Sequence, residues 1–122
     1  MVSKEIVVDG VAYVPKGTNQ EKAPSLKGKE YCVVRTYSAG VFVGYIDRKV
    51  KGKENTIFNV RRIWYWDGAA SLSQMANDGV SKPQTCKFSQ VVKEQDLKEI
   101  IEVIPCSKKA KESIEGVSIW EQ

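Results

Sequence analysis

The sequence predicts an α+β fold whose body is an antiparallel β-sheet, with a β-hairpin before it and two short helices within it. Three segments rich in β-branched and aromatic residues, at 31–37, 41–50 and 56–66, are separated only by short polar turns. This pattern is typical of a meander, in which consecutive strands pair as antiparallel neighbours. We therefore expect the three segments to lie side by side in one sheet.

The N-terminal part of the chain predicts a small hairpin followed by a linker. Apolar residues flank Asp9-Gly10, a dipeptide that accepts the positive φ angles of a tight turn. Strands at 6–8 and 11–14 are expected to pair across it, and Pro15 ends the second. Residues 16–30 carry Gly, Pro, Asn and Lys with little apolar content, which predicts a flexible linker. The chain of 122 residues is thus expected to be a single domain, with 1–15 as hairpin, 16–30 as linker and 31–122 as main body.

Two short helices are expected after the third body strand. Ser71 is placed to cap the first helix and Gly79 to end it, while Ser107 and Gly116 bracket the second, KKAKESIE. Between the helices, a strand is expected at 86–92. The segment 96–104 fits either a helix face or a strand, and its β-branched run IIEVI favours the strand.

The composition excludes several kinds of site. The chain contains no histidine, which removes the commonest general base and every Ser-His or Cys-His nucleophile. Its three cysteines are widely spaced, so they match neither a disulfide framework nor a zinc motif. No apolar run is long enough to span a bilayer. We therefore expect a cytosolic protein that is not an enzyme, holds no metal or cofactor, and keeps its thiols reduced.

The segment RRIWYW, residues 61–66, is the strongest candidate for a binding site. Alternation along a strand would place Arg62, Trp64 and Trp66 on one face and Arg61, Ile63 and Tyr65 on the other. Arginine offers a donor fork for phosphate, and an aromatic ring offers a surface on which a base can stack. On the structural side, Trp64 and Ile63 are expected to be mainly core. The candidate ligand-binding residues are Arg35, Arg61 and Arg62 for phosphate, Trp64, Trp66 and Phe88 for stacking, and Ser71 at a helix start.

The chain resembles a family of small proteins from tailed bacteriophages and prophages. The resemblance rests on RRIWYWDGAASLSQMANDGV, with VVRTYSAGVFVGYI upstream and VIPCSKKAKESIEGVSIW downstream. The family carries no enzymatic motif, so the resemblance implies a location, the cytoplasm of a bacterial host, but no reaction. By analogy with other small phage proteins, the resemblance also implies a sponge, that is, a protein that binds and so sequesters an anionic nucleotide-type immune signal. Such signals include the cyclic ADP-ribose species of Thoeris and cyclic dinucleotides. A homo-oligomer with sites between subunits is the expected form.

Two other readings of the sequence stay open. The net charge of +4 favours anionic partners, so the same strand face and the basic run RKVKGK could bind nucleic acid instead. Alternatively, the aromatics are only core and interface, and the protein is a structural or interaction component without a small ligand.

Overall fold

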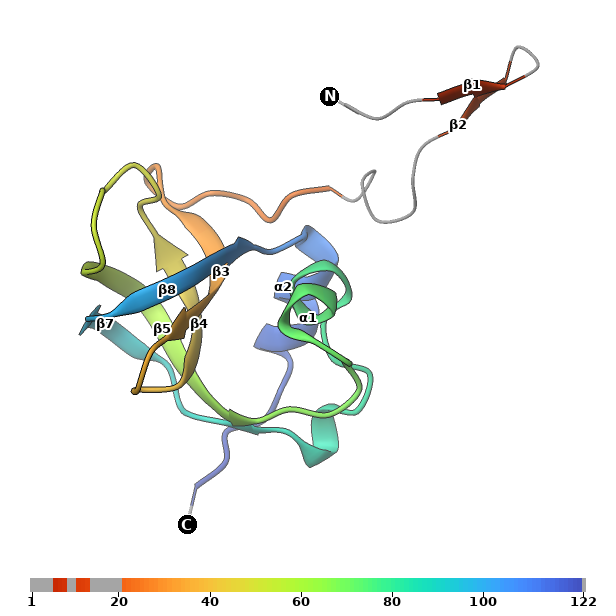
Figure 1. The fold of residues 1–122 in the computed structure, drawn as a ribbon. Coiled ribbons are helices and arrows are strands. Elements are labelled where there is room, and N and C mark those ends of the chain that lie inside the picture. Colours follow the sequence, from red (N-terminus) through yellow and green to blue (C-terminus); the bar gives the residue numbers. More distant parts are fainter. Residues whose placement is uncertain (1–5, 9–10, 14–20, 122) are drawn as a thin grey trace.

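The body of the protein is a six-stranded sheet with two short helices against one face (Figure 1). The computed structural model describes residues 6–8, 11–13 and 21–121. The strands are β1 (Ile6–Val8), β2 (Val11–Tyr13), β3 (Glu30–Thr36), β4 (Val41–Ile46), β5 (Asn55–Tyr65), β6 (Lys87–Phe88), β7 (Val92–Leu97) and β8 (Ile100–Pro105). The helices are α1 (Leu72–Asp78), a 3₁₀ turn at Pro83–Thr85, and α2 (Lys108–Glu115). The predicted α+β class is confirmed.

The expected meander is present. β3 pairs with β4 and β4 with β5, both antiparallel, with Val33 opposite Val43 and Val43 opposite Arg61. β4 is shorter than expected, because the chain turns after Ile46 and the amide of Val50 donates to the carbonyl of Asp47.

The prediction of a strand over residues 86–92 is wrong about the length of that strand. β6 contains only two residues, after which Ser89 binds the backbone of Arg62: its amide donates to Arg62 O at 2.8 Å, and its Oγ accepts from Arg62 N at 2.7 Å. The chain then starts β7 at Val92. The choice of strand over helix for 96–104 is confirmed, because β7 and β8 occupy this region with a two-residue connection between them.

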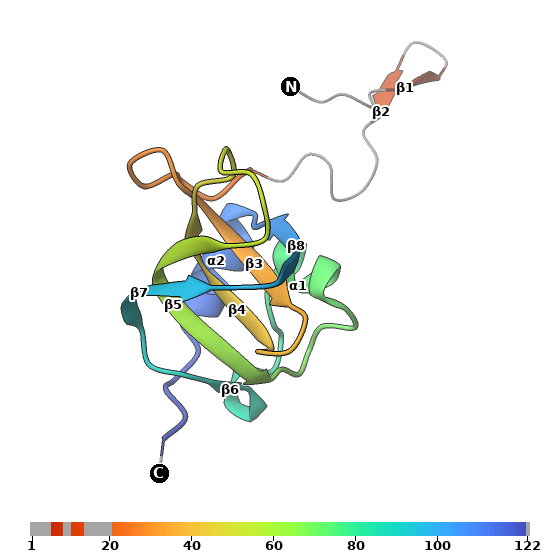
Figure 2. The same ribbon diagram turned by 60° about the vertical axis from the view of Figure 1, so that its left-hand side comes forward.

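The sheet curls so that its two ends approach each other (Figure 2). β7 pairs with the first half of β5, and β8 pairs with β3 on the other side of the meander. The strands thus enclose one apolar cluster, the strand-side core, formed by Cys32, Val34, Phe42, Ile46, Ile57, Val60 and Leu97. The opposite face packs against the helices in a helix-side core, which includes Tyr31, Val33, Val43, Ile63, Met75, Phe88, Ala110 and Ile114.

Both helices begin at the predicted serines. Ser71 Oγ accepts from Gln74 N at 3.1 Å and Ser107 Oγ accepts from Ala110 N at 3.0 Å, so each satisfies a free amide of a helix start. Gly79 follows α1 with φ 80°, and a β-carbon there would collide with Ser113 of α2. Neither described helix, of seven and eight residues, could cross a bilayer.

A bulge bends β5 at Asn59. The register of β4 and β5 shifts between Val43 and Tyr45, and Asn59 takes φ 50°. Opposite it, a β-carbon on Gly44 would lie 2.8 Å from Ile57 Cγ2 and 2.9 Å from Phe58 O. Only glycine allows the two strands to approach this closely.

The N-terminal segments agree with the predicted hairpin where they are described. β1 and β2 pair antiparallel, with Ile6 opposite Tyr13. The Asp9-Gly10 turn, Val14, Pro15 and the first part of the expected linker lie outside the described residues.

The later part of the expected linker, from Glu21, is bonded to the body. The amide of Ala23 donates to Cys106 O at 3.1 Å and that of Lys108 to Glu21 O at 2.7 Å. Leu26 and Lys29 exchange two backbone hydrogen bonds of 2.9 Å, which close a tight turn.

Candidate functional site: a basic groove

Arg61 lies inside the protein, with 4% of its surface exposed. Its Nε donates to Ser89 O at 2.7 Å and its Nη1 to Ile114 O at 3.0 Å, while Nη2 lies 3.5 Å from Ser118 O. Burial lowers the pKa of the guanidinium, but an arginine in a protein stays protonated. Arg61 therefore fastens the end of α2 and the tail after it to the sheet.

The expectation that Trp64 is mainly core is wrong. The register of β5 and β6 shifts between Ile63 and Tyr65, which leaves Trp64 as the extra residue of a bulge. Its side chain is 51% exposed and meets Trp120 edge to face, with 5.3 Å between ring centroids. Ile63 is buried as expected. Trp66 packs on the same helix-side core as Ile63, so simple alternation gave it the wrong face.

Phe88 is fully buried in the helix-side core, with the Arg61 guanidinium 5.3 Å from its ring centroid. It has no exposed face on which a base could stack. The side chain of Arg62 lies over the Phe42 ring at 4.8 Å, and its Nε is buried without a hydrogen-bond partner among the described residues. Arg35 is paired with Glu102 at 2.9 Å.

A groove forms elsewhere, between the 26–29 turn, the β5 bulge and the start of β7. One part, the lysine hollow, has a volume of about 440 Å³ and is lined by Leu26, Lys27, Lys29, Phe58, Asn59 and Lys93. The adjoining part, the tyrosine hollow, measures about 410 Å³ and is lined by Leu26, Tyr31, Tyr45, Asn59, Arg61, Val91 and Glu115. Leu26 and Asn59 border both hollows, so we treat them together as the basic groove. Each volume falls in the range of small-molecule sites.

The lysine hollow combines cations with an aromatic ring. Lys29 Nζ lies 4.8 Å from the centroid of Phe58. Lys27, Lys29 and Lys93 form no ion pair with any other described residue, whereas Lys22, Lys98 and Lys111 are paired with carboxylates. A third hollow, of about 350 Å³ beside Glu54 and Asp96, has its charges engaged by Lys98 and by the Thr56 hydroxyl. The lysine hollow therefore has three ammonium groups that no carboxylate neutralises among the described residues, although Lys29 also contacts the Phe58 ring.

Backbone strain is concentrated at the basic groove. Three non-glycine residues in the described part of the chain have positive φ angles, namely Lys27, Asn59 and Glu99. Two of these line the groove. Lysine is not favoured in this conformation, while asparagine tolerates it better. Strain of this kind persists where the surroundings enforce it, and it gathers at functional sites.

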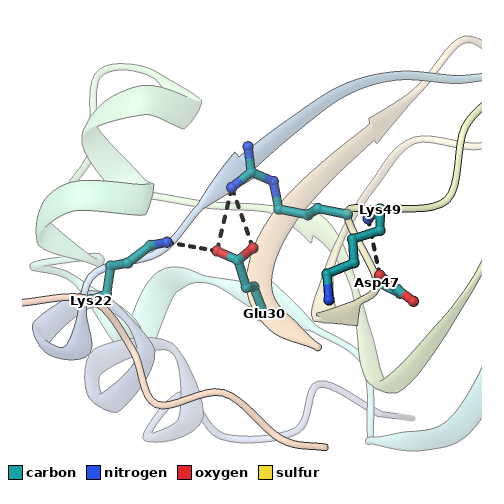
Figure 3. Close-up of polar contacts among 5 residues, drawn as sticks. Lys22, Glu30, Asp47 and Lys49 are labelled. Carbon is teal, nitrogen blue, oxygen red and sulfur yellow. Dashed lines mark hydrogen bonds and ion pairs between the residues drawn. The ribbon is translucent and has the colours of Figure 1, made fainter. Parts of the chain in front are cut away.

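An ion-pair cluster around Glu30 ties the segment before the 26–29 turn to the sheet (Figure 3). The Glu30 carboxylate accepts from Lys22 at 2.9 Å, and Arg48 Nη1 lies 3.3 Å from the same oxygen. Lys22 belongs to the segment that carries the 26–29 turn, and Arg48 follows β4. The hydrogen bond from Lys22 lowers the pKa of Glu30, against the opposing effect of burial and with further help from the charge of Arg48.

This lowered pKa predicts a pH dependence. A carboxylate whose pKa is lower in the folded protein stabilises it above its ordinary pKa of 4.5, and this contribution is lost as the pH falls through the folded-state value. We expect Glu30→Gln to lower stability by up to about 1 kcal/mol at pH 7. The difference from the parent should shrink as the pH falls below about 4.5. Melting temperatures of both proteins from pH 7 to pH 3 test this, and a gap that stays constant over that range would contradict it.

Of the seven predicted binding residues, Arg61 lines the groove, at the back of the tyrosine hollow. The others lie elsewhere, and Ser71 caps α1. Sequence reasoning missed Lys27, Lys29, Phe58, Asn59 and Lys93. Two local signals were available: Lys27-Gly28 is a turn dipeptide inside the expected linker, and Asn59 is a residue that strands disfavour but left-handed bulge positions accept.

The three cysteines are free and buried. Burial raises the pKa of Cys32 and of Cys106 to about 12, so both are thiols at neutral pH. Within the described part of the chain, no three cysteine or carboxylate side chains gather as metal ligands would.

Comparison with known proteins identifies a family for this chain. Neither the curated proteins nor the solved structures contain a significant match to this chain. The profile of DUF6948, described as a domain of unknown function, matches residues 29–114, which span the sheet, α1 and nearly all of α2. The match covers most of the chain, and the protein therefore belongs to the DUF6948 family.

Proposed function

We propose that this domain is a non-enzymatic binding protein that holds an anionic, ring-containing small molecule of the nucleotide type in the basic groove. The observation that carries the proposal is the lysine hollow, which Lys27, Lys29 and Lys93 line together with Phe58, and where these lysines have no carboxylate partner among the described residues. Ammonium groups attract phosphate oxygens, and an aromatic ring beside them favours a ligand that also has a flat apolar part.

The strained turn supports the same function. Lys27 is held at φ 50° and is followed by Gly28 at φ 80°, in a turn closed by the paired hydrogen bonds of Leu26 and Lys29. Asparagine or glycine would fit this turn with less strain. A lysine at this position makes sense if its ammonium group serves a ligand.

In a bacterial host, such a protein would act as a sponge. It would sequester a nucleotide signal of an immune system, of the cyclic ADP-ribose or cyclic dinucleotide class, and so protect a bacteriophage. Native mass spectrometry of the protein purified from bacteria with an active nucleotide-signalling defence would reveal a ligand that co-purifies.

Neutralising the lysine hollow is expected to weaken nucleotide binding about tenfold or more, because hydrogen bonds to charged groups are among the stronger ones. The variant combines Lys27→Asn, Lys29→Gln and Lys93→Gln. The matched control combines Lys49→Gln, Lys82→Gln and Lys109→Gln, which removes the same charge from exposed positions outside the groove. Calorimetric titration with AMP, cyclic ADP-ribose and cyclic di-AMP measures the effect.

Measuring the stability of each variant shows whether a loss of binding in this experiment comes from misfolding. Lys27→Asn alone should leave the protein equally stable or stabilise it by up to about 1 kcal/mol, because asparagine tolerates a positive φ angle. Equal binding by the groove variant and the control would contradict the proposal. If a single-stranded oligonucleotide binds instead, with an affinity that falls steeply as salt rises, the site serves nucleic acid rather than a small molecule.

A further inference from the structure

The tyrosine hollow differs in character from the lysine hollow beside it. Tyr31 and Tyr45 meet edge to face, with 5.1 Å between centroids, and both are buried. Leu26 and Val91, which are 39% and 56% exposed, border the hollow with apolar surface. The exposed apolar surface of Leu26 and Val91 therefore suits an uncharged ring better than a phosphate.

The charged groups at the tyrosine hollow are largely engaged. Arg61 donates to the carbonyl oxygens of Ser89 and Ile114, as described above. Lys111, which lies over both tyrosine rings, is paired with Glu115 Oε1 at 3.0 Å. Glu115 has a side chain that is 50% exposed, so its carboxylate remains accessible from the hollow.

The two ends of the basic groove therefore favour different parts of a ligand. Phosphate is favoured at the lysine end, where no carboxylate pairs with the three lysines among the described residues, and not at the other end, where Lys111 is already paired with Glu115. A carboxylate only accepts hydrogen bonds, so it selects a ring that carries N–H donors. Asn59, on the border of both hollows, would lie beside the sugar that joins the two parts.

We infer that the basic groove binds a nucleotide whose base carries an exocyclic amino group, with its phosphate at the lysine hollow and its base in the tyrosine hollow, where Glu115 accepts from the amino group. This inference rests on the proposed function, and it adds the class of base and the orientation of the ligand.

The test uses three probes that differ by one part at a time: AMP, purine riboside 5′-monophosphate, which lacks the amino group, and ribose 5-phosphate, which lacks the base. Each is titrated into the parent protein, Glu115→Ala and Glu112→Ala. Glu112 is the matched control, because it is an exposed carboxylate on the same helix that does not line the groove. Melting temperatures confirm that all three proteins are folded.

We expect the parent and Glu112→Ala to bind AMP about tenfold more tightly than purine riboside 5′-monophosphate, in keeping with a hydrogen bond to a charged acceptor. Glu115→Ala should lose this preference, and ribose 5-phosphate should bind weakest to every protein. If the parent binds both nucleotides equally, or if Glu115→Ala keeps the preference, the inference is overturned while the proposed function stands. If no nucleotide binds to the parent, the proposed function fails and the inference fails with it.

Discussion

Replacing Arg61 with alanine is expected to lower the free energy of unfolding by about 3 kcal/mol or more, since each buried polar group left without its partner costs about 1 to 3 kcal/mol. The guanidinium is 4% exposed and serves the carbonyl groups of Ser89 and Ile114 directly, with Ser118 at a longer distance. Alanine would leave these carbonyls unsatisfied and would open a cavity beside Phe88. Urea unfolding followed by circular dichroism measures the loss.

Two further variants separate charge from geometry at Arg61. Arg61→Lys keeps the charge, but an ammonium group cannot reproduce the planar fork of donors, so we expect it to recover only a minor part of the loss. Arg35→Ala is the control, because Arg35 is exposed and has one ion pair, with Glu102. Arg35→Ala should lower the free energy of unfolding by no more than about 1 kcal/mol. If Arg61→Ala were as mild as Arg35→Ala, the buried network would not anchor α2.

The regular elements could be predicted from local sequence. The β-branched and aromatic runs of β3, β4 and β5 need only their own residues to be recognised, as do the serine caps of the helices. The strand β7 was harder, because its sequence VKEQDL is almost entirely polar. It pairs with β5 by its backbone and buries only Leu97. Its sequence therefore lacks the alternation of apolar and polar residues that predicts a strand.

The burial of single residues could not be read in the same way. Arginine is almost never buried unless it is paired, and the partners of Arg61 are carbonyls that lie 28 to 57 residues further along the chain. Trp64 was misplaced because a one-residue bulge reverses the expected facing of a strand, and that bulge depends on the pairing of β5 with β6.

The basic groove was invisible to sequence patterns for a related reason. Its residues come from the 26–29 turn, β3, β4, β5 at and beside its bulge, the start of β7 and the end of α2. Each contributes one to three side chains, and nothing in their spacing along the chain indicates that they meet. The dense arginine and tryptophan segment drew attention because it is contiguous, but contiguous strand residues alternate between faces and cannot all line one cavity.

Phe88→Ala is expected to destabilise the protein by about 3 to 5 kcal/mol, which is the usual cost of removing a buried aromatic ring from a packed core. Phe88 is fully buried, lies under the Arg61 guanidinium and pairs through its backbone with Ile119, while its carbonyl accepts from Trp120 N at 2.9 Å. The conservative Phe88→Leu should cost much less, because it keeps most of the volume.

Trp64→Ala also removes an aromatic ring and is the matched control for Phe88→Ala. It should lower the free energy of unfolding by no more than about 1 kcal/mol, because Trp64 is about half exposed to solvent. Urea unfolding of both variants, with equal slopes against denaturant, allows the two costs to be compared directly. The contrast distinguishes a buried ring from an exposed one on adjacent paired strands. If Trp64→Ala cost as much as Phe88→Ala, the Trp64 and Trp120 rings would have to be covered in solution, and the same unfolding measured at several protein concentrations would show whether a second copy of the chain covers them.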